Sequence, residues 1–190
     1  GAEGRPRALG VWSNGIRSFL PSIGTGNPAS DARSINHLNE IAGVGTLYKD
    51  GCSFITTRGV LWELEDGWIN TRSLPPIGGP ESSAYQINAR GEIIGGSHLS
   101  GGAAHPTLWV DSQPRDLIGM GNGTVGASQI NNRSQGVGSY QGLRFFTGYD
   151  PGKRACLWQN NVFIDLNKLV TFTTSWPYYW TNLIAATSIN

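Results

Sequence analysis

The chain has 190 residues, of which 27 are Gly and 7 are Trp, and its formal net charge is +1. This length is enough for one domain with its own core. The small net charge excludes a strongly basic nucleic-acid binder, and the absence of any run of 18 apolar residues excludes a membrane-spanning helix. Low charge, high glycine and abundant Trp favour a β-rich protein that is secreted or held at the cell surface.

The first predicted elements are a short strand at Val11-Trp12 and a second strand that ends near Leu20. Asn14-Gly15 lies between them and is typical of a two-residue hairpin turn, because both residues tolerate positive φ. From residue 32 onward, the sequence predicts units of four short strands. The first strand of each unit ends in Ala-x-x-Ile-Asn, the second is rich in Ile, Val and Gly, the third contains an aliphatic residue followed by Trp, and the fourth carries a Leu.

These features recur in a fixed order, so the chain contains an internal repeat. Ala-x-x-Ile-Asn occurs four times, and the Trp residues of the third strands are 47 to 50 residues apart. The copies of the two patterns are Ala32–Asn36, Ala84–Asn88, Ala127–Asn131 and Ala186–Asn190, and Val11-Trp12, Leu61-Trp62, Leu108-Trp109 and Leu157-Trp158.

Each recurring residue has an expected structural role. The Asn residues at 36, 88 and 131 are expected to hydrogen-bond the backbone of the turn that follows, and replacement of one by Ala is expected to cost about 1 kcal/mol. The four Trp residues are expected to pack at equivalent buried positions, where an aromatic ring contributes most to stability.

The predicted fold is all-β: a β-propeller-type array of four-stranded blades, with about four repeats of roughly 50 residues. The alternative is another kind of β-repeat array. The expected boundaries are a partial blade at 1–31, blades at 32–83, 84–126 and 127–185, and the first strand of a further blade at 186–190. A fragment of a larger propeller is favoured over a small ring that lacks one strand.

The repeat resembles a known family once its motifs are placed in order. Ala-x-x-Ile-Asn-x-x-Gly-x-Ile-x-Gly precedes His105–Trp109 in one copy and Arg154–Trp158 in another, and Asp116-Leu117 and Asp165-Leu166 follow. This order resembles the bacterial HAF repeat of extracellular proteins, over almost the whole chain. The resemblance implies an extracellular, periplasmic or cell-surface location and a β-propeller-like fold. It implies no catalytic residues.

The titratable residues predict no enzyme, cofactor or metal site, because they do not cluster in the sequence. The His residues are scattered, and His105 stands at the repeat position that Arg58 and Arg154 occupy in other copies, which indicates a structural role. Cys52 and Cys156 are either one disulfide or two separate small apolar residues, and the sequence leaves both open.

The candidate recognition residues lie where the chain departs from the repeat. The insertion from Thr173 to Thr181 contains Trp176, Tyr178, Tyr179 and Trp180, and a second aromatic group contains Phe145, Phe146 and Tyr149. Insertions in repeat proteins often form the binding face, and clustered aromatic side chains occur in carbohydrate sites and protein interfaces. A local core that seals the end of the array is the equal alternative.

The sequence therefore predicts a non-enzymatic repeat module that binds protein or has an accessory role in a larger assembly. The alternatives are a carbohydrate-binding, lectin-like propeller with a polysaccharide as partner, and a non-catalytic fragment of a larger secreted enzyme.

Overall fold

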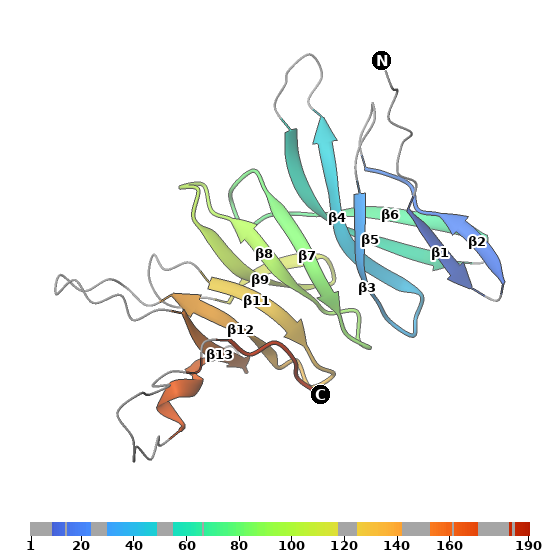
Figure 1. Cartoon of the computed structure of the whole chain (residues 1–190). Coiled ribbons are helices and arrows are strands. Elements are labelled where there is room, and N and C mark those ends of the chain that lie inside the picture. Colours follow the sequence, from blue (N-terminus) through green and yellow to red (C-terminus); the bar gives the residue numbers. More distant parts are fainter. Residues whose placement is uncertain are drawn as a thin grey trace, which may run out of the picture.

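The computed structural model (Figure 1) describes residues 9–13, 15–23, 30–48, 55–65, 67–117, 125–141, 153–160, 162–170, 183 and 185–190. Within these ranges the fold is all-β, as predicted: the strands form four antiparallel sheets, and the only helical segment described is the short 3-10 turn η1 (Leu166–Lys168).

Each sheet is formed by strands that are consecutive in the chain. The N-terminal sheet is the hairpin β1 (Gly10–Ser13) and β2 (Ile16–Phe19). The second sheet contains β3 (Ser30–Ile35), β4 (Glu40–Tyr48), β5 (Ile55–Glu65) and β6 (Trp68–Leu74). The third contains β7 (Ser82–Ile87), β8 (Ile93–His98), β9 (Ala104–Val110) and β10 (Gln113–Asp116). The fourth contains β11 (Val125–Ile130), β12 (Gly136–Gln141), β13 (Lys153–Gln159) and β14 (Val162–Asp165).

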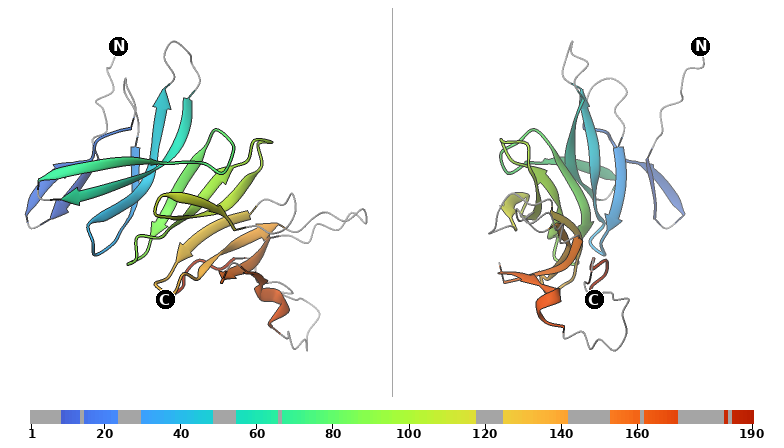
Figure 2. Two further views of the ribbon diagram at one scale, coloured as in Figure 1. Left: turned by 180° about the vertical axis from the view of Figure 1, so that it is seen from behind. Right: turned by 60° about the vertical axis from the view of Figure 1, so that its left-hand side comes forward.

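Successive sheets pack face to face along an arc (Figure 1). β7, the first strand of the third sheet, contacts β3, β4 and β5 of the second, and β11 contacts β7, β8 and β9 in the same way. The hairpin β1–β2 and the sheet β11–β14 lie at opposite ends of this arc in all views (Figure 2). The described sheets therefore do not close on themselves.

A β-bulge explains the spacing of the Ala-x-x-Ile-Asn motif. Ala84 pairs with Gly95 and Gln86 pairs with Ile94, so Tyr85 is an extra residue in β7. The same irregularity follows the Ala of β3 and of β11. Because side chains alternate between the faces of a regular strand, residues three apart would point in opposite directions. The extra residue restores the alignment, and Ala84 and Ile87 enter the same core cluster.

The hydrophobic core consists of three layers, one at each junction between successive sheets. In the middle layer Trp109 packs against Leu61 and Leu74 of the preceding sheet. Its indole N–H donates to the carbonyl of Pro75 at 2.8 Å. Trp62 repeats this arrangement one sheet earlier, and its indole N–H donates to the carbonyl of Pro21 at 2.7 Å. The repeated Trp therefore always faces the sheet that precedes it in the chain.

The expectation that all four repeat Trp residues are buried is wrong for Trp12. Trp62, Trp109 and Trp158 are buried, whereas 70% of the Trp12 surface is exposed. Each buried Trp packs against the sheet that precedes its own. Trp12 is in the first sheet, and no preceding sheet covers it among the described residues.

The repeat Asn residues form a ladder that joins successive sheets. The Asn88 side-chain oxygen accepts from the N–H groups of Arg90 and Glu92, and its amide group donates to the Glu92 carboxylate. The same amide group donates to the carbonyl of Asn131 in the next sheet at 2.9 Å. Asn36 and Asn131 make the equivalent bonds, with the side-chain amide oxygen of Gln135 in place of a carboxylate at Asn131. The amide of Asn36 donates to the carbonyl of Asn88 in the next sheet, and the amide of Asn131 donates to the carbonyl of Asn190.

The predicted side-chain-to-backbone bonds of Asn36, Asn88 and Asn131 are therefore confirmed. The bond from Asn131 places Asn190 beside the turn that follows β11, and the N–H of Ala186 donates to the carbonyl of Gly138 in β12. Residues 186–190 form no strand. The turns that carry the Asn residues lie in a row with the C-terminus at the bottom of Figure 1.

We expect Asn88→Ala to lower the free energy of unfolding by about 2–3 kcal/mol, more than the sequence alone indicates, because the buried side chain makes four hydrogen bonds rather than one. Urea unfolding measures the effect. The control is Asn70→Ala, which removes an exposed amide group that donates to Glu63. Equal losses in the two variants would contradict the role assigned to the ladder.

Candidate functional site

Both aromatic groups predicted as recognition surfaces lie outside the described residues. These are Trp176, Tyr178, Tyr179 and Trp180 in one group, and Phe145, Phe146 and Tyr149 in the other. Cys52 also lies outside them, while Cys156 is buried with a free thiol. The carbohydrate-binding alternative, which depended on the first group, remains a prediction.

The polar residues of the third and fourth strands form structural contacts. His105 is buried, and its Nδ1 lies 2.8 Å from the Asp116 carboxylate. At the same repeat position in the last sheet, the Arg154 guanidinium lies 3.4 Å from the buried Asp165 carboxylate. The Asp-Leu motif therefore supplies a partner for the basic residue of the preceding strand, which confirms the structural role predicted for His105.

Asp165 and two residues that interact with it, Tyr140 and Cys156, have shifted pKa values. Burial acts to raise the pKa of Asp165, but hydrogen bonds from the Tyr140 hydroxyl and from Asn167, together with the charge of Arg154, outweigh it and hold that pKa below its usual value. Burial and the bond to Asp165 raise the pKa of Tyr140 to about 12, and burial raises the pKa of the Cys156 thiol to about 12. These shifts reflect a buried structural network, because each follows from burial and from partners within the sheet.

We expect Tyr140→Phe to lower the free energy of unfolding at neutral pH by about 1–2 kcal/mol, because it removes a hydrogen bond to a buried carboxylate. The lowered pKa of Asp165 stabilises the fold above its unfolded value of about 3.9, and this contribution disappears as pH falls through the folded pKa. In the variant the folded pKa of Asp165 lies closer to the unfolded value, so the acid loss is smaller and is complete at a higher pH.

At alkaline pH the wild type is expected to lose stability between pH 10.0 and about 12, the interval between the unfolded and folded pKa values of Tyr140. The variant lacks this step. Urea unfolding across pH measures both ends, with Tyr85→Phe, a change at an exposed tyrosine, as the control. Parallel pH profiles for wild type and Tyr140→Phe would contradict the prediction.

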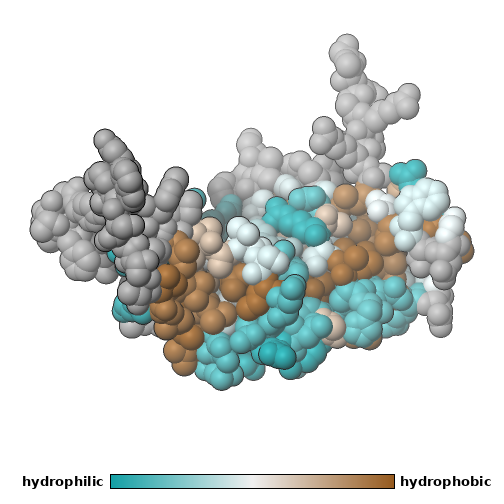
Figure 3. Space-filling model, turned by 60° about the horizontal axis from the view of Figure 1, so that its bottom comes forward, coloured by the Kyte–Doolittle hydropathy of each residue, from teal (hydrophilic) through white to brown (hydrophobic). Residues whose placement is uncertain are grey.

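A broad concave surface lies over the row of Asn turns. It is an open groove of about 600 Å³, lined by the ends of β3, β7 and β11 and by Asn190. Figure 3 shows this side of the molecule, with apolar areas beside hydrophilic ones. The amide groups of Asn36, Asn88 and Asn131 already bond the backbone and the next sheet. These three amide groups are therefore not free to bind a ligand, whereas the side chains of His37 and Arg133 also line the groove.

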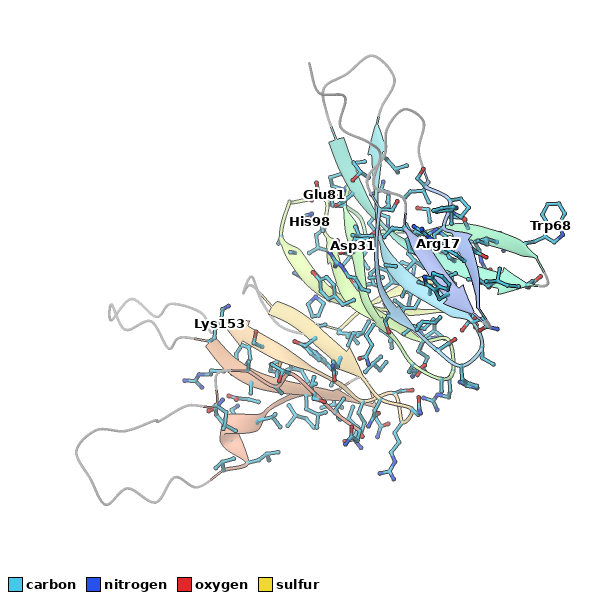
Figure 4. All side chains as sticks on the ribbon, turned by 45° about the vertical axis from the view of Figure 1, so that its right-hand side comes forward. Arg17, Asp31, Trp68, Glu81, His98 and Lys153 are labelled. Carbon is cyan, nitrogen blue, oxygen red and sulfur yellow. The ribbon has the colours of Figure 1, made fainter. Side chains whose placement is uncertain are left out.

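The N-terminal sheet exposes Trp12, whose repeat equivalents Trp62, Trp109 and Trp158 are buried, and it also exposes Phe19. Trp12 and Phe19 lie on the same face of the hairpin, since Trp12 pairs with Arg17 and Phe19 pairs with Gly10. This face is directed away from β3–β6, because Val11 on the opposite face packs against the cluster that contains Trp62. The Arg17 guanidinium lies 4.7 Å from the centre of the Phe19 ring. We call Trp12, Arg17 and Phe19 the outer face. Arg17 is labelled on it in Figure 4.

A second uncovered region lies on the other side of the hairpin. An apolar slot of about 270 Å³ is lined by Gly10, Val11, Leu20, Ile41 and residues 32–35. Ile35 is 54% exposed there, whereas the equivalent residues Ile87 and Ile130 are 4% and 3% exposed. The outer face and the slot together form the candidate binding site. Sequence analysis did not predict it, although the isolated Val11-Trp12 motif indicated an incomplete unit.

No cluster of three or more His, Cys, Asp or Glu side chains that could hold a metal ion occurs in the part of the chain that the structure describes. Nor does any helix described there have the length and apolar character needed to cross a membrane. Comparisons of the chain with protein-family models, with curated proteins and with solved structures found no match.

Proposed function

We propose that the chain is a non-enzymatic, propeller-type repeat module that binds protein and takes its place in a larger assembly through its N-terminal sheet. The observation that carries this proposal is the contrast between Trp12, which is 70% exposed, and its buried equivalents Trp62 and Trp109. The equivalent apolar surface is buried at each of the remaining junctions of the array. An exposed apolar surface of this kind is typical of an interface.

The propeller-type arrangement is supported by the repeated four-stranded sheets and by the ladder that links their first strands. A location outside the cytoplasm rests on the resemblance to the HAF repeat. A binding role without catalysis also agrees with the structural use of His105, Asp116 and Asp165, which hold neighbouring strands together.

Photocrosslinking from the outer face tests the proposal. Benzoylphenylalanine replaces Trp12 in cells that produce the protein, and the matched control places it at Trp68, which is 82% exposed and projects from the end of the β5–β6 hairpin (Figure 4). We expect a discrete protein product from position 12 that is absent from position 68 and is lost when Phe19→Asp is added. The same products from both positions, or none from position 12, would overturn the proposal.

A further inference from the structure

We propose that the slot beside the hairpin β1–β2 binds a two-stranded β-segment with the repeat's own pattern, Ala-x-x-Ile-Asn-x-x-Gly-x-Ile-x-Gly. The segment would pair with the edge of β1 that has no partner among the described residues, and would complete a four-stranded sheet. This inference rests on the assembly function proposed above and names the chemistry of the partner: an extended strand pair carrying Ala, Ile, Asn and Gly at fixed positions.

The first argument is the free edge of β1. By repeat position β1 corresponds to β5, β9 and β13, the third strands of the larger sheets. Each of these third strands is paired on both sides, to the second and to the fourth strand of its sheet. Among the described residues β1 pairs only with β2. Its other edge therefore has the backbone groups to bind a second strand by β-strand addition.

The second argument is the shape of the slot. In the next layer, Ile87 packs against Leu61 of a third strand and Ala42 of a second strand. In the layer after that, Ile130 packs against Leu108 and Ile94 in the same way.

At the slot, the equivalent third-strand residue Val11 is present beside Ile35. No second-strand residue stands there among the residues that the structure describes, and this explains why Ile35 is exposed. The slot therefore lies where a second-strand residue with a small or aliphatic side chain, such as Ala42 or Ile94 in the other layers, would pack.

The third argument is the direction of the Asn ladder. The carbonyl groups of Asn88 and Asn131 each accept the amide of the Asn in the preceding sheet, as well as an N–H from their own turn. The carbonyl of Asn36 accepts the N–H of Asn39, and no Asn amide in the described structure reaches it. An incoming Ile-Asn would supply this donor, so the recognition includes a polar contact as well as apolar burial.

A fusion protein tests the inference. A second copy of residues 80–98, which contains β7 and β8, is placed before Gly1 of the full chain, so that the eight residues before Leu9 act as the linker. Tethering gives a high effective concentration of the segment at the slot. We expect the midpoint of thermal unfolding to rise by about 5 °C. Hydrogen exchange at Leu9–Ser13 is expected to slow by about tenfold.

Matched variants separate slot binding from a general effect of the added residues. Ile35→Asp, at an exposed residue of the slot, is expected to remove the gain, whereas Trp68→Ala is expected to leave it unchanged. Ala in place of the Asn of the fused copy is expected to reduce the gain. A fused segment of scrambled sequence is expected to give none.

Three results would overturn the inference. These are an equal gain with the scrambled segment, no added protection at Leu9–Ser13, and self-association of the wild-type chain that Ile35→Asp abolishes, since a second copy would then be the occupant. A specific crosslink from position 12, combined with no stabilisation in the fusion protein, would support the assembly function. It would also show that strand addition at the slot is not the way the module binds. A failed crosslink together with a successful fusion test would overturn the proposed assembly function and leave strand addition at the slot standing.

Discussion

Gly95→Ala is expected to destabilise the protein by about 3–5 kcal/mol, well above the usual effect of adding one methyl group. A Cβ built on Gly95 would lie 2.0 Å from the carbonyl oxygen of Ser83 and 3.0 Å from the Cα of Ala84. Both contacts are with backbone of the neighbouring strand β7, so no side chain can rotate away. The strands must separate instead, which weakens their hydrogen bonds.

The close approach is a property of the repeat, since Gly43 and Gly138 have the same environment opposite Ala32 and Ala127. In every case the Gly pairs with the Ala that precedes the bulge. The bulge brings the two backbones together, and only Gly fits opposite it. This explains why the second strand of each repeat retains a Gly although an internal Gly lowers β propensity.

Urea unfolding of Gly95→Ala and Gly126→Ala gives the comparison. Gly126 is also in a strand, a Cβ there would meet nothing within 4 Å, and its φ is not positive. We expect Gly126→Ala to change the free energy of unfolding by less than about 0.5 kcal/mol. Similar values for the two variants would show that β7 and β8 can move apart at little cost.

Much of this fold follows from the sequence because its determinants are local. The Asn of each motif bonds the turn that immediately follows it, and the Asp111-Ser112 turn between β9 and β10 has positive φ at both residues, as its composition predicts. His105 and Asp116 lie on adjacent strands joined by that tight turn. Spacing alone brings such pairs together.

The features that sequence analysis missed depend on packing between sheets. Ala84 and Ile87 are three residues apart, which does not fit the two-residue period of a strand. This spacing in the sequence indicated the bulge that the structure shows, but the sequence analysis did not use it. The exposure of Trp12 was not predicted because the motif is identical whether or not a preceding sheet is present. The slot beside Ile35 was not predicted for the same reason. In the larger sheets a second strand covers this position, and the described part of the chain contains no such strand beside β1.

Trp109→Ala is expected to lower the free energy of unfolding by about 4–5 kcal/mol, whereas Trp12→Ala is expected to lower it by less than about 1 kcal/mol. The side chain of Trp109 is fully buried between the second and third sheets, so its removal leaves a large cavity. Removal also leaves the carbonyl of Pro75 without the indole donor. Trp12 has the same repeat position but is 70% exposed, so little burial is lost.

The two Trp variants together test the direction of packing in the array. Each is measured by urea unfolding of the full chain, with Trp109→Phe as an intermediate that keeps an aromatic ring but loses the indole N–H. We expect the order of loss to be Trp109→Ala, then Trp109→Phe, then Trp12→Ala. A large loss for Trp12→Ala in the isolated chain would mean that its face is covered in solution. The outer face would then be part of the core rather than a surface for assembly.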